Sequence, residues 1–304
     1  MIYIITGGNS FIGIALCNCL SAESHDIILV CREHSTCALQ ESNHVRIVRY
    51  KGLSDMLTVA KYVDFADVFV HLAWNGTRGA SRNDSEAQQK NVEDSMLALQ
   101  TAKDLGCKLF VEAGSQAEHG FINTVFDEKT FCHPDSEYGK AKLEFGERAT
   151  KFCKTVGMKF LHLRYVSIFG KHDYSQSLIM SCIDKMLRNE DIELSSCEQN
   201  WNYLDVNDAA RQTYLLTKYA LETPKFKSEI FLIGSHDTRK LRSFVEEMRI
   251  LTHTHSNLHF GEYHPLDTVS LNPCILKTEG ATGGFIASRT FGQVVTEIIK
   301  DFKK

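Results

Sequence analysis

Short apolar runs alternate with helical patterns through the first half of the chain, and this alternation limits the possible folds more than any other feature. Each run has the length of one strand, and several are rich in β-branched residues. The predicted strands are residues 2–6, 27–31, 45–48, 68–73, 109–113 and 160–165. Because helices separate the strands, the sequence predicts an α/β fold, a doubly wound parallel sheet covered by helices on both faces.

The predicted helices divide the chain less evenly than the strands do. They cover residues 11–20, 85–105, 135–153, 206–221 and 241–250, with a further strand at 230–233. After residue 170 the regular alternation weakens, so we expect a dinucleotide-binding domain over residues 1–170 and a smaller substrate-binding lobe over residues 171–304. No segment between the two parts has the composition of a flexible linker. The sequence therefore predicts two interleaved lobes without a sharp boundary at residue 170.

The first predicted strand runs directly into a glycine-rich turn that precedes a helix. Glycines at such a turn allow the backbone to approach a pyrophosphate, and the helix N-terminus offers unpaired N–H groups. This context predicts a dinucleotide-binding turn, although an ordinary tight turn is the simpler alternative. Ser10 stands where the middle glycine of the pattern is expected. The candidate cofactor-binding residues here are Gly7, Asn9, Ser10, Phe11, Ile12 and Gly13.

The second strand ends at Arg32, without the acidic residue that would bind the ribose 2′-hydroxyl of NAD. An arginine at this point is suited to pairing with the 2′-phosphate of NADP. The sequence therefore favours NADP over NAD, although exposed arginines after strands are common.

A tyrosine and a lysine lie four residues apart in the predicted helix over residues 135–153. Tyr138 and Lys142 therefore emerge on the same helix face. A cationic lysine beside a tyrosine favours the phenolate, which makes the hydroxyl a usable acid or base near neutral pH. Ser115 follows the strand over residues 109–113, at the sheet edge where ligands bind, and its hydroxyl is suited to orienting a carbonyl. The alternative interpretation of Tyr138 and Lys142 is a solvent-exposed helix surface, and that of Ser115 is a capping serine in a loop.

These motifs occur in one order along nearly the whole chain and resemble the extended short-chain dehydrogenase/reductases of the nucleotide-sugar epimerase/dehydratase family. The resemblance includes the glycine turn, an HLA signature at His71-Leu72-Ala73, and a triad formed by Ser115, Tyr138 and Lys142. It continues through residues 163–170 and 203–210. It implies a Rossmann domain that binds NAD(P), with Leu72, Ala73, Tyr138, Lys142 and Tyr165 also at the cofactor.

The resemblance also implies roles for the triad in an NAD(P)-dependent oxidoreductase that acts on a nucleotide sugar. Tyr138 donates or accepts the proton, Lys142 is its electrostatic partner, and Ser115 holds the oxygen. Dehydratases of the family carry an acidic pair directly after the serine or threonine. Gln116 and Ala117 stand there in this chain, which argues against 4,6-dehydration.

The sequence around the triad is similar to bacterial 4-ketoreductases that complete deoxysugars such as CDP-abequose. The predicted substrate contacts are Trp74, Asn75, Gln116, Glu118 and Trp201. The leading hypothesis is reduction of a nucleotide-linked 4-keto-6-deoxyhexose. An NAD-dependent nucleotide-sugar 4-epimerase and a noncatalytic NAD(P)-binding sensor or structural protein remain open. The family resemblance also suggests a homodimer.

Charge and cysteine content exclude several other classes of protein. The net charge of −4 and the absence of a basic stretch predict no nucleic-acid partner. No apolar run has membrane-spanning length, and the first strand leaves no room for a leader, so we expect a cytoplasmic protein. The ten cysteines lack paired spacing and are expected to be reduced. A metal site is not expected, because the histidines at 253, 255, 259 and 264 match no ligand motif.

Overall fold

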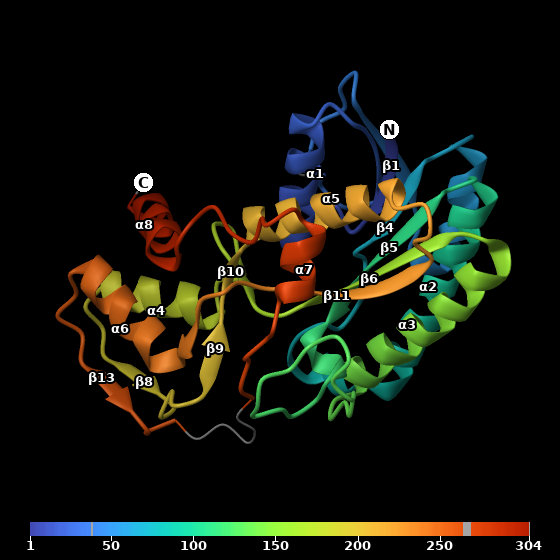
Figure 1. Ribbon diagram of the computed structural model, residues 1–304. Helices are drawn as coiled ribbons and strands as arrows, with labels where there is room; N and C mark the ends of the chain where they lie inside the picture. The colour runs from blue at the N-terminus through green and yellow to red at the C-terminus, as the bar shows by residue number, and fades with distance from the viewer. Residues whose placement is uncertain (38, 264–268, 304) are drawn as a thin grey trace.

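A seven-stranded parallel sheet forms the centre of the computed structural model, which describes residues 1–37, 39–263 and 269–303 (Figure 1). The strand order is β11-β6-β5-β4-β1-β2-β3, and every neighbouring pair is parallel. The strands are β1 Ile2–Thr6, β2 Asp26–Arg32, β3 Val45–Tyr50, β4 Val68–His71, β5 Leu109–Ser115, β6 Lys159–Tyr165 and β11 Ser228–Ile233. The predicted fold class is confirmed.

Helices cover both faces of this sheet because successive strand residues point to opposite sides. In β1, Tyr3 and Ile5 enter the core on one face, whereas Ile4 enters the core on the other. The first core is covered by α1 (Phe11–Ala22) and α5 (Val206–Glu222). The second is covered by α2 (Ser85–Asp104), α3 (Glu137–Val156) and the short helix η1 (Leu53–Lys61).

Helix α3, which carries the predicted tyrosine and lysine, begins and ends at identifiable caps. Ser136 is its N-cap, and the serine Oγ accepts a hydrogen bond from Gly139 N at 3.2 Å. The helix ends before Gly157, whose φ of 73° is left-handed and therefore suits glycine. The helix thus starts two residues later and ends three residues later than the predicted range of 135–153.

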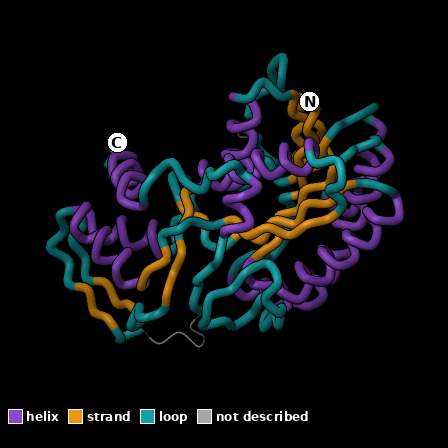
Figure 2. The backbone as a smooth tube through the Cα atoms, in the orientation of Figure 1, coloured by secondary structure: helices purple, strands orange, loops and turns teal. Residues whose placement is uncertain are grey.

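A smaller lobe packs beside the main sheet, as Figures 1 and 2 show. Its core joins Phe244 and neighbouring apolar side chains of three helices. The helices are α4 Leu178–Leu187, α6 Leu241–Thr252 and α8 Phe291–Phe302, with β8 Ile192–Leu194 paired to β13 Leu258–Phe260. The remaining strands are β7 Ile168–Phe169, β9 Asn200–Asn202, β10 Leu204–Asp205 and β12 Thr238–Lys240, and helix α7 Leu276–Ala281 contacts α5 and β11. Several are too short for the sequence pattern to reveal.

The chain returns to the large sheet after it has entered the smaller lobe. Helix α5 and strand β11 follow residue 170, yet both pack in the first core and β11 pairs with β6. A single boundary at residue 170 therefore does not separate the two cores. Helix α5 and strand β11 come after that residue but belong to the first core. Within the described residues, no helix combines the length and the apolar character needed to cross a membrane.

Candidate functional site

Two adjoining cavities open along the carboxyl edge of the parallel strands, where open α/β sheets bind ligands. The first, here called the β2 cavity, has a volume of about 450 Å³ and lies between the ends of β1, β2 and β3. The second, the α3 cavity, has a volume of about 600 Å³ and reaches β5 and α3. Ser10, Leu72 and Trp74 line both cavities, so the two form one continuous groove.

The glycine turn after β1 and the first residues of α1 line both cavities. Gly7 has φ +71°, and a Cβ built on it would lie 2.7 Å from Ala73 N. A Cβ on Gly13 would lie 2.3 Å from Gly7 O, so both positions require glycine to keep strand and helix close. Ser10 instead has an ordinary φ of −75° and caps α1 by accepting from Gly13 N at 3.1 Å, which explains why no glycine is needed there.

The predicted turn residues therefore fit the pyrophosphate of a dinucleotide. Phe11 and Ile12, in the first turn of α1, line the α3 cavity beside Ser10. Asn9 lines the β2 cavity, and its amide donates to Thr36 O at 2.9 Å. Gly13 lies behind the turn and acts through packing. The first turn of α1 borders the groove, and the positive end of its helix dipole there favours an anion.

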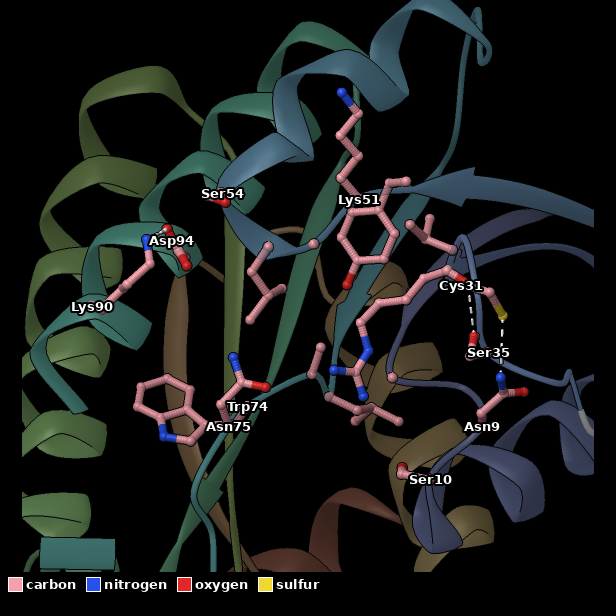
Figure 3. Close-up of a pocket in the computed structure, with 18 residues that line it drawn as sticks. Asn9, Ser10, Cys31, Ser35, Lys51, Ser54, Trp74, Asn75, Lys90 and Asp94 are labelled. Carbon is pink, nitrogen blue, oxygen red and sulfur yellow. Dashed lines mark hydrogen bonds and ion pairs between the residues drawn. The ribbon is translucent and has the colours of Figure 1, made fainter. Parts of the chain in front are cut away.

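The loop after β2 places cationic and hydroxyl groups at the far end of the β2 cavity. Arg32, Ser35 and Lys51 all line it. Arg49 shapes the loop, because its guanidinium donates to Arg32 O at 3.0 Å and to Ser35 O at 2.6 Å. Figure 3 shows Asn9, Cys31 and Ser35 on one side of the cavity, opposite Trp74, Asn75, Lys90 and Asp94.

The three residues of the predicted triad, Ser115, Tyr138 and Lys142, all line the α3 cavity. Tyr138 and Lys142 project from α3, whereas Ser115 ends β5. Tyr138 is largely buried, and burial raises the pKa of its hydroxyl. A hydrogen bond with Ser115 and the charge of Arg82 act in the opposite direction.

Ser115 is held by a reciprocal cap at the start of the short helix η3 (Gln116–Glu118). Its Oγ accepts from Ala117 N at 3.2 Å, and its backbone N–H donates to Glu118 Oε1 at 2.8 Å. This is a capping box, and the Ser-x-x-Glu spacing of Ser115 and Glu118 is its sequence signal. The capping role, considered as an alternative for Ser115, therefore coexists with a position in the cavity.

Lys142 is nearly inaccessible to solvent and has several partners. Its Nζ donates to Ala113 O at 2.7 Å and lies 3.7 Å from the centroid of the Trp74 ring. Glu112 Oε1 is 3.6 Å away. Burial lowers the pKa of Lys142, and the carboxylates of Glu112 and Glu118 oppose that shift.

The residues of the HLA signature and Tyr165 lie next to the two cavities. His71 is fully buried between Thr6 Oγ1 at 2.8 Å and Ser95 Oγ at 2.9 Å, and burial lowers its pKa to about 3, so the imidazole is neutral. Leu72 and Ala73 line the β2 cavity, and their contact with a cofactor stays a prediction. Tyr165 lines the α3 cavity, while its hydroxyl pairs with Thr213 Oγ1 at 2.7 Å.

The five predicted substrate contacts do not converge on one place. Trp74 lines both cavities, and its ring packs edge-on against Tyr138. Asn75 lines the β2 cavity instead, where Asn91 binds its backbone. Gln116, in η3, is partly exposed. It lines neither cavity, and its contact with substrate stays a prediction.

The other two predicted contacts, Glu118 and Trp201, lie outside the linings of both cavities. Glu118 has no exposed surface, because His162, Arg164 and the Ser115 N–H surround its carboxylate, so it supports the site from behind. Trp201 donates from its indole N–H to Ser167 Oγ at 3.1 Å and packs against Tyr203, and it does not belong to the described lining of the α3 cavity.

Other residues at the cavity were not identified from the sequence. Thr77, Arg78, His172 and Tyr174 line its outer part, and Arg78 lies over the Tyr174 ring at 4.7 Å. They come from irregular loops, where side-chain direction has no periodic signal. Buried Glu112 and His162 were also missed, although a charged or polar residue within an apolar strand pattern is an available signal.

A model of the family described as NAD dependent epimerase/dehydratase matches residues 3–234. The chain belongs to this family. It is therefore an oxidoreductase of the extended short-chain dehydrogenase/reductase type, as the motifs predicted. The family explains why the glycine turn and the triad meet along one groove.

Individual relatives are distant. The chain is 20% identical to CDP-abequose synthase of Salmonella muenchen over 264 residues, which cover 85% of this chain and 83% of the relative. It is 23% identical to dTDP-D-glucose 4,6-dehydratase of Dictyostelium discoideum over 231 residues, which cover 67% of this chain and 52% of the relative. The chain thus spans about half the length of the second relative.

Solved structures share the fold at similarly low identity. A UDP-glucose 4-epimerase of Thermotoga maritima, in complex with UDP-glucose, is similar with a TM-score of 0.86 and 19% identity, covering 100% of this chain and 99% of the other. A UDP-glucuronic acid 4-epimerase of Bacillus cereus with NAD gives a TM-score of 0.82 and 18% identity over 100% of both chains.

The histidine-rich segment shows no arrangement for a metal ion within the described part of the chain. No group of three or more His, Cys, Asp or Glu side chains there is placed to hold one. His253 ends α6, and His259 lies 3.5 Å from Asp191. His264 falls outside the described residues.

Proposed function

We propose that this protein reduces a nucleotide-linked 4-keto-6-deoxyhexose, with NADPH as the hydride donor and NADP as the oxidised cofactor that results. One observation carries the proposal: Ser115, Tyr138 and Lys142 line a cavity whose opposite side is the first turn of α1. That cavity continues into the β2 cavity, so a dinucleotide along the groove extends toward the triad.

The triad residues have distinct roles in this reaction. A reduced dinucleotide held along the glycine turn would supply the hydride that reduces the sugar ketone. Tyr138 donates its hydroxyl proton to the oxygen of the former ketone, and Ser115 Oγ holds that oxygen by a hydrogen bond. Lys142 stabilises the phenolate that Tyr138 becomes, because the two side chains share one helix face.

Reduction is favoured over dehydration by the residues after Ser115. Dehydration needs a proton donor and acceptor there, whereas Gln116 and Ala117 provide no ionisable group. The match to CDP-abequose synthase over 83% of that relative supports a deoxysugar substrate. The epimerase and dehydratase relatives also act on nucleotide-linked sugars according to their names, which supports the nucleotide part of the substrate.

The direct test follows NADPH or NADH oxidation by absorbance against CDP- and dTDP-linked 4-keto-6-deoxysugars. We expect stoichiometric oxidation of NADPH with one member of the panel. If none is reduced by the folded, dinucleotide-binding protein, the reductase proposal is wrong. Tightly copurified NAD together with interconversion of 4-hydroxy sugars would then establish the 4-epimerase, and dinucleotide binding without any turnover would favour a noncatalytic binder.

The preference for NADP rests on three groups around one end of the β2 cavity. Arg32 supplies a planar cation, Lys51 a second positive charge, and Ser35 a hydroxyl, all suited to a 2′-phosphate. We expect Arg32→Ala to weaken NADP binding by about tenfold to a hundredfold and NAD binding by less than about threefold, measured as dissociation constants by titration.

Arg46→Ala is the matched control for that titration. Arg46 is an exposed arginine on β3, outside the lining of the β2 cavity, and its loss should leave both dissociation constants unchanged. Equal weakening of NADP and NAD by Arg32→Ala would remove Arg32 from 2′-phosphate recognition.

Location and assembly complete the proposal. All ten cysteines are free thiols, which supports a reducing compartment such as the cytosol. The family resemblance supports a homodimer through α2 and α3, which pack against each other on one face of the sheet.

A further inference from the structure

A chain of buried ionisable side chains runs directly behind the triad, and none of them opens into the α3 cavity except Lys142. From Lys142 it passes to Glu112, His162, Glu118 and Arg164, which are all less than 4% exposed. Buried charges are costly unless they are paired, so a series of this length has to be closely matched in charge and geometry.

His162 on β6 is the centre of this chain because each ring nitrogen contacts a different carboxylate. Nδ1 lies 2.6 Å from Glu112 Oε2, and Nε2 lies 2.8 Å from Glu118 Oε2. Burial alone would lower the pKa of His162, but the two carboxylates outweigh it and raise the pKa to about 9. The imidazole is therefore a cation that joins two anions at neutral pH.

The two carboxylates lead to different members of the triad. Glu112 Oε1 has Lys142 Nζ at 3.6 Å and is otherwise without a hydrogen-bond partner among the described residues. Glu118 Oε1 accepts the Ser115 backbone N–H at 2.8 Å, and its other oxygen accepts from Arg164 Nε at 2.7 Å. His162 thus links the lysine side of the triad to the serine side.

We propose that Glu112 is a positioning residue for the proposed reaction, and that its carboxylate, aligned by His162, holds Lys142 in its protonated form beneath Tyr138. The inference rests on the proposed function only for its kinetic consequence. Its physical basis is the contact between two buried, oppositely charged side chains.

The other groups around Lys142 do not provide this charge. His71 on β4 is neutral, and its contacts are to Thr6 and Ser95. Glu118 acts on Lys142 from η3 without a direct contact and already accepts from three partners. Arg82 of η2 (Gly79–Asn83) faces the Tyr138 ring at 4.6 Å. Its positive charge disfavours the protonated form of Lys142 and cannot replace the Glu112 carboxylate. His119, whose pKa burial lowers to about 4, is neutral as well.

The contact has a consequence for pH dependence. Lys142 lies in surroundings that favour its neutral form, since burial lowers its pKa and the Trp74 ring offers only a weak cation site. Without the Glu112 charge the proton leaves Lys142 at a lower pH. The stabilisation of the Tyr138 phenolate is then lost at that lower pH, so the alkaline limb of the activity profile shifts toward neutrality.

The test replaces Glu112 by Gln, which keeps the shape of the side chain and removes its charge. The measurement is the profile of kcat/KM against pH, with the 4-keto sugar that the enzyme reduces as substrate. We expect the alkaline limb of this profile to move to lower pH in Glu112→Gln. At pH 9 the variant should be about tenfold slower than the wild type, and at pH 6.5 less than about threefold slower. Glu112→Asp, which restores the charge, should recover most of the wild-type profile.

A second readout does not require the proposed reaction. Lysine ¹³Cε shifts followed by NMR against pH, with the Lys142 signal assigned by its loss in Lys142→Met, report the Lys142 pKa directly. We expect that pKa to fall in Glu112→Gln and to remain unchanged in Glu229→Gln, a carboxylate on β11 that pairs with Lys277 at 3.0 Å. A shifted titration in a protein with no reductase activity would support the positioning role and reject the proposed function alone.

Two outcomes would overturn the inference. One is a Lys142 titration in Glu112→Gln that superimposes on that of the wild type. The other is an activity loss of equal size at every pH, which indicates a structural role for Glu112. If Glu112→Gln does not fold, Glu112→Met removes the same charge with an apolar side chain of similar length and should lower the Lys142 pKa in the same NMR titration. An unchanged titration there would equally reject the proposal.

Discussion

Tyr138→Phe should lower kcat for sugar reduction by about 10²- to 10⁴-fold, the range over which a positioned proton donor contributes to a rate. The variant loses only the hydroxyl. Its ring can keep the edge-on contact with Trp74 and the position beneath Arg82, so the cavity retains its shape. Steady-state oxidation of NADPH gives the rate, and fluorescence titration of NADPH should give a dissociation constant within about threefold of the wild type.

Tyr174→Phe is the matched control for this experiment. Tyr174 lines the same cavity, but its hydroxyl donates to Gln176 Oε1 at 2.8 Å and is already engaged outside the triad. We expect less than about a tenfold change in kcat for this variant. Equal rates for Tyr138→Phe and the wild type would show that another group delivers the proton, and weak NADPH binding by both variants would indicate a general disturbance of the cavity.

The sheet could be predicted from the sequence because its strands are nearly continuous apolar runs between amphipathic helices. Ile27 and Phe110, for example, are buried on a sheet covered on both faces, so their strands needed no alternation to be recognised. The smaller lobe was less visible, because β9 and β12 have only three residues each and owe their pairing to tertiary contacts. Short segments such as these carry no periodic signal of their own.

The candidate site shows the same division between local and tertiary information. Tyr138 and Lys142 share one helix, so their spacing alone places them together. Glu118 and Trp201 were assigned to the substrate from their positions near motifs, and the structure turns both toward other protein groups. The contacts with His162 and Ser167 come from distant parts of the chain, so only the capping role of Glu118 had a local signal, its Ser-x-x-Glu spacing from Ser115.

The second large effect concerns stability and follows from the same buried chain. Glu118→Ala leaves His162 and Arg164 without the carboxylate that contacts both of them. It also removes the acceptor for the Ser115 N–H. Breaking a buried ion pair by removing one partner costs about 3–5 kcal/mol, so we expect a loss of that size in the free energy of unfolding by urea. Glu222→Ala, at an exposed carboxylate at the end of α5, should change it by less than about 0.5 kcal/mol.

The acid range separates the Glu118 contacts from other causes of instability. Burial alone would raise the pKa of Glu118, but His162, Arg164 and the Ser115 N–H lower it from 4.5 to about 2. Because the folded pKa lies below the unfolded one, this contribution is fully present above pH 4.5 and is lost as the pH falls toward about 2. Urea unfolding at several pH values should therefore show a smaller difference between wild type and Glu118→Ala at pH 3 than at pH 6. A constant difference across this range would mean that the variant loses packing rather than charge pairing, and the buried chain would then have no electrostatic role in folding.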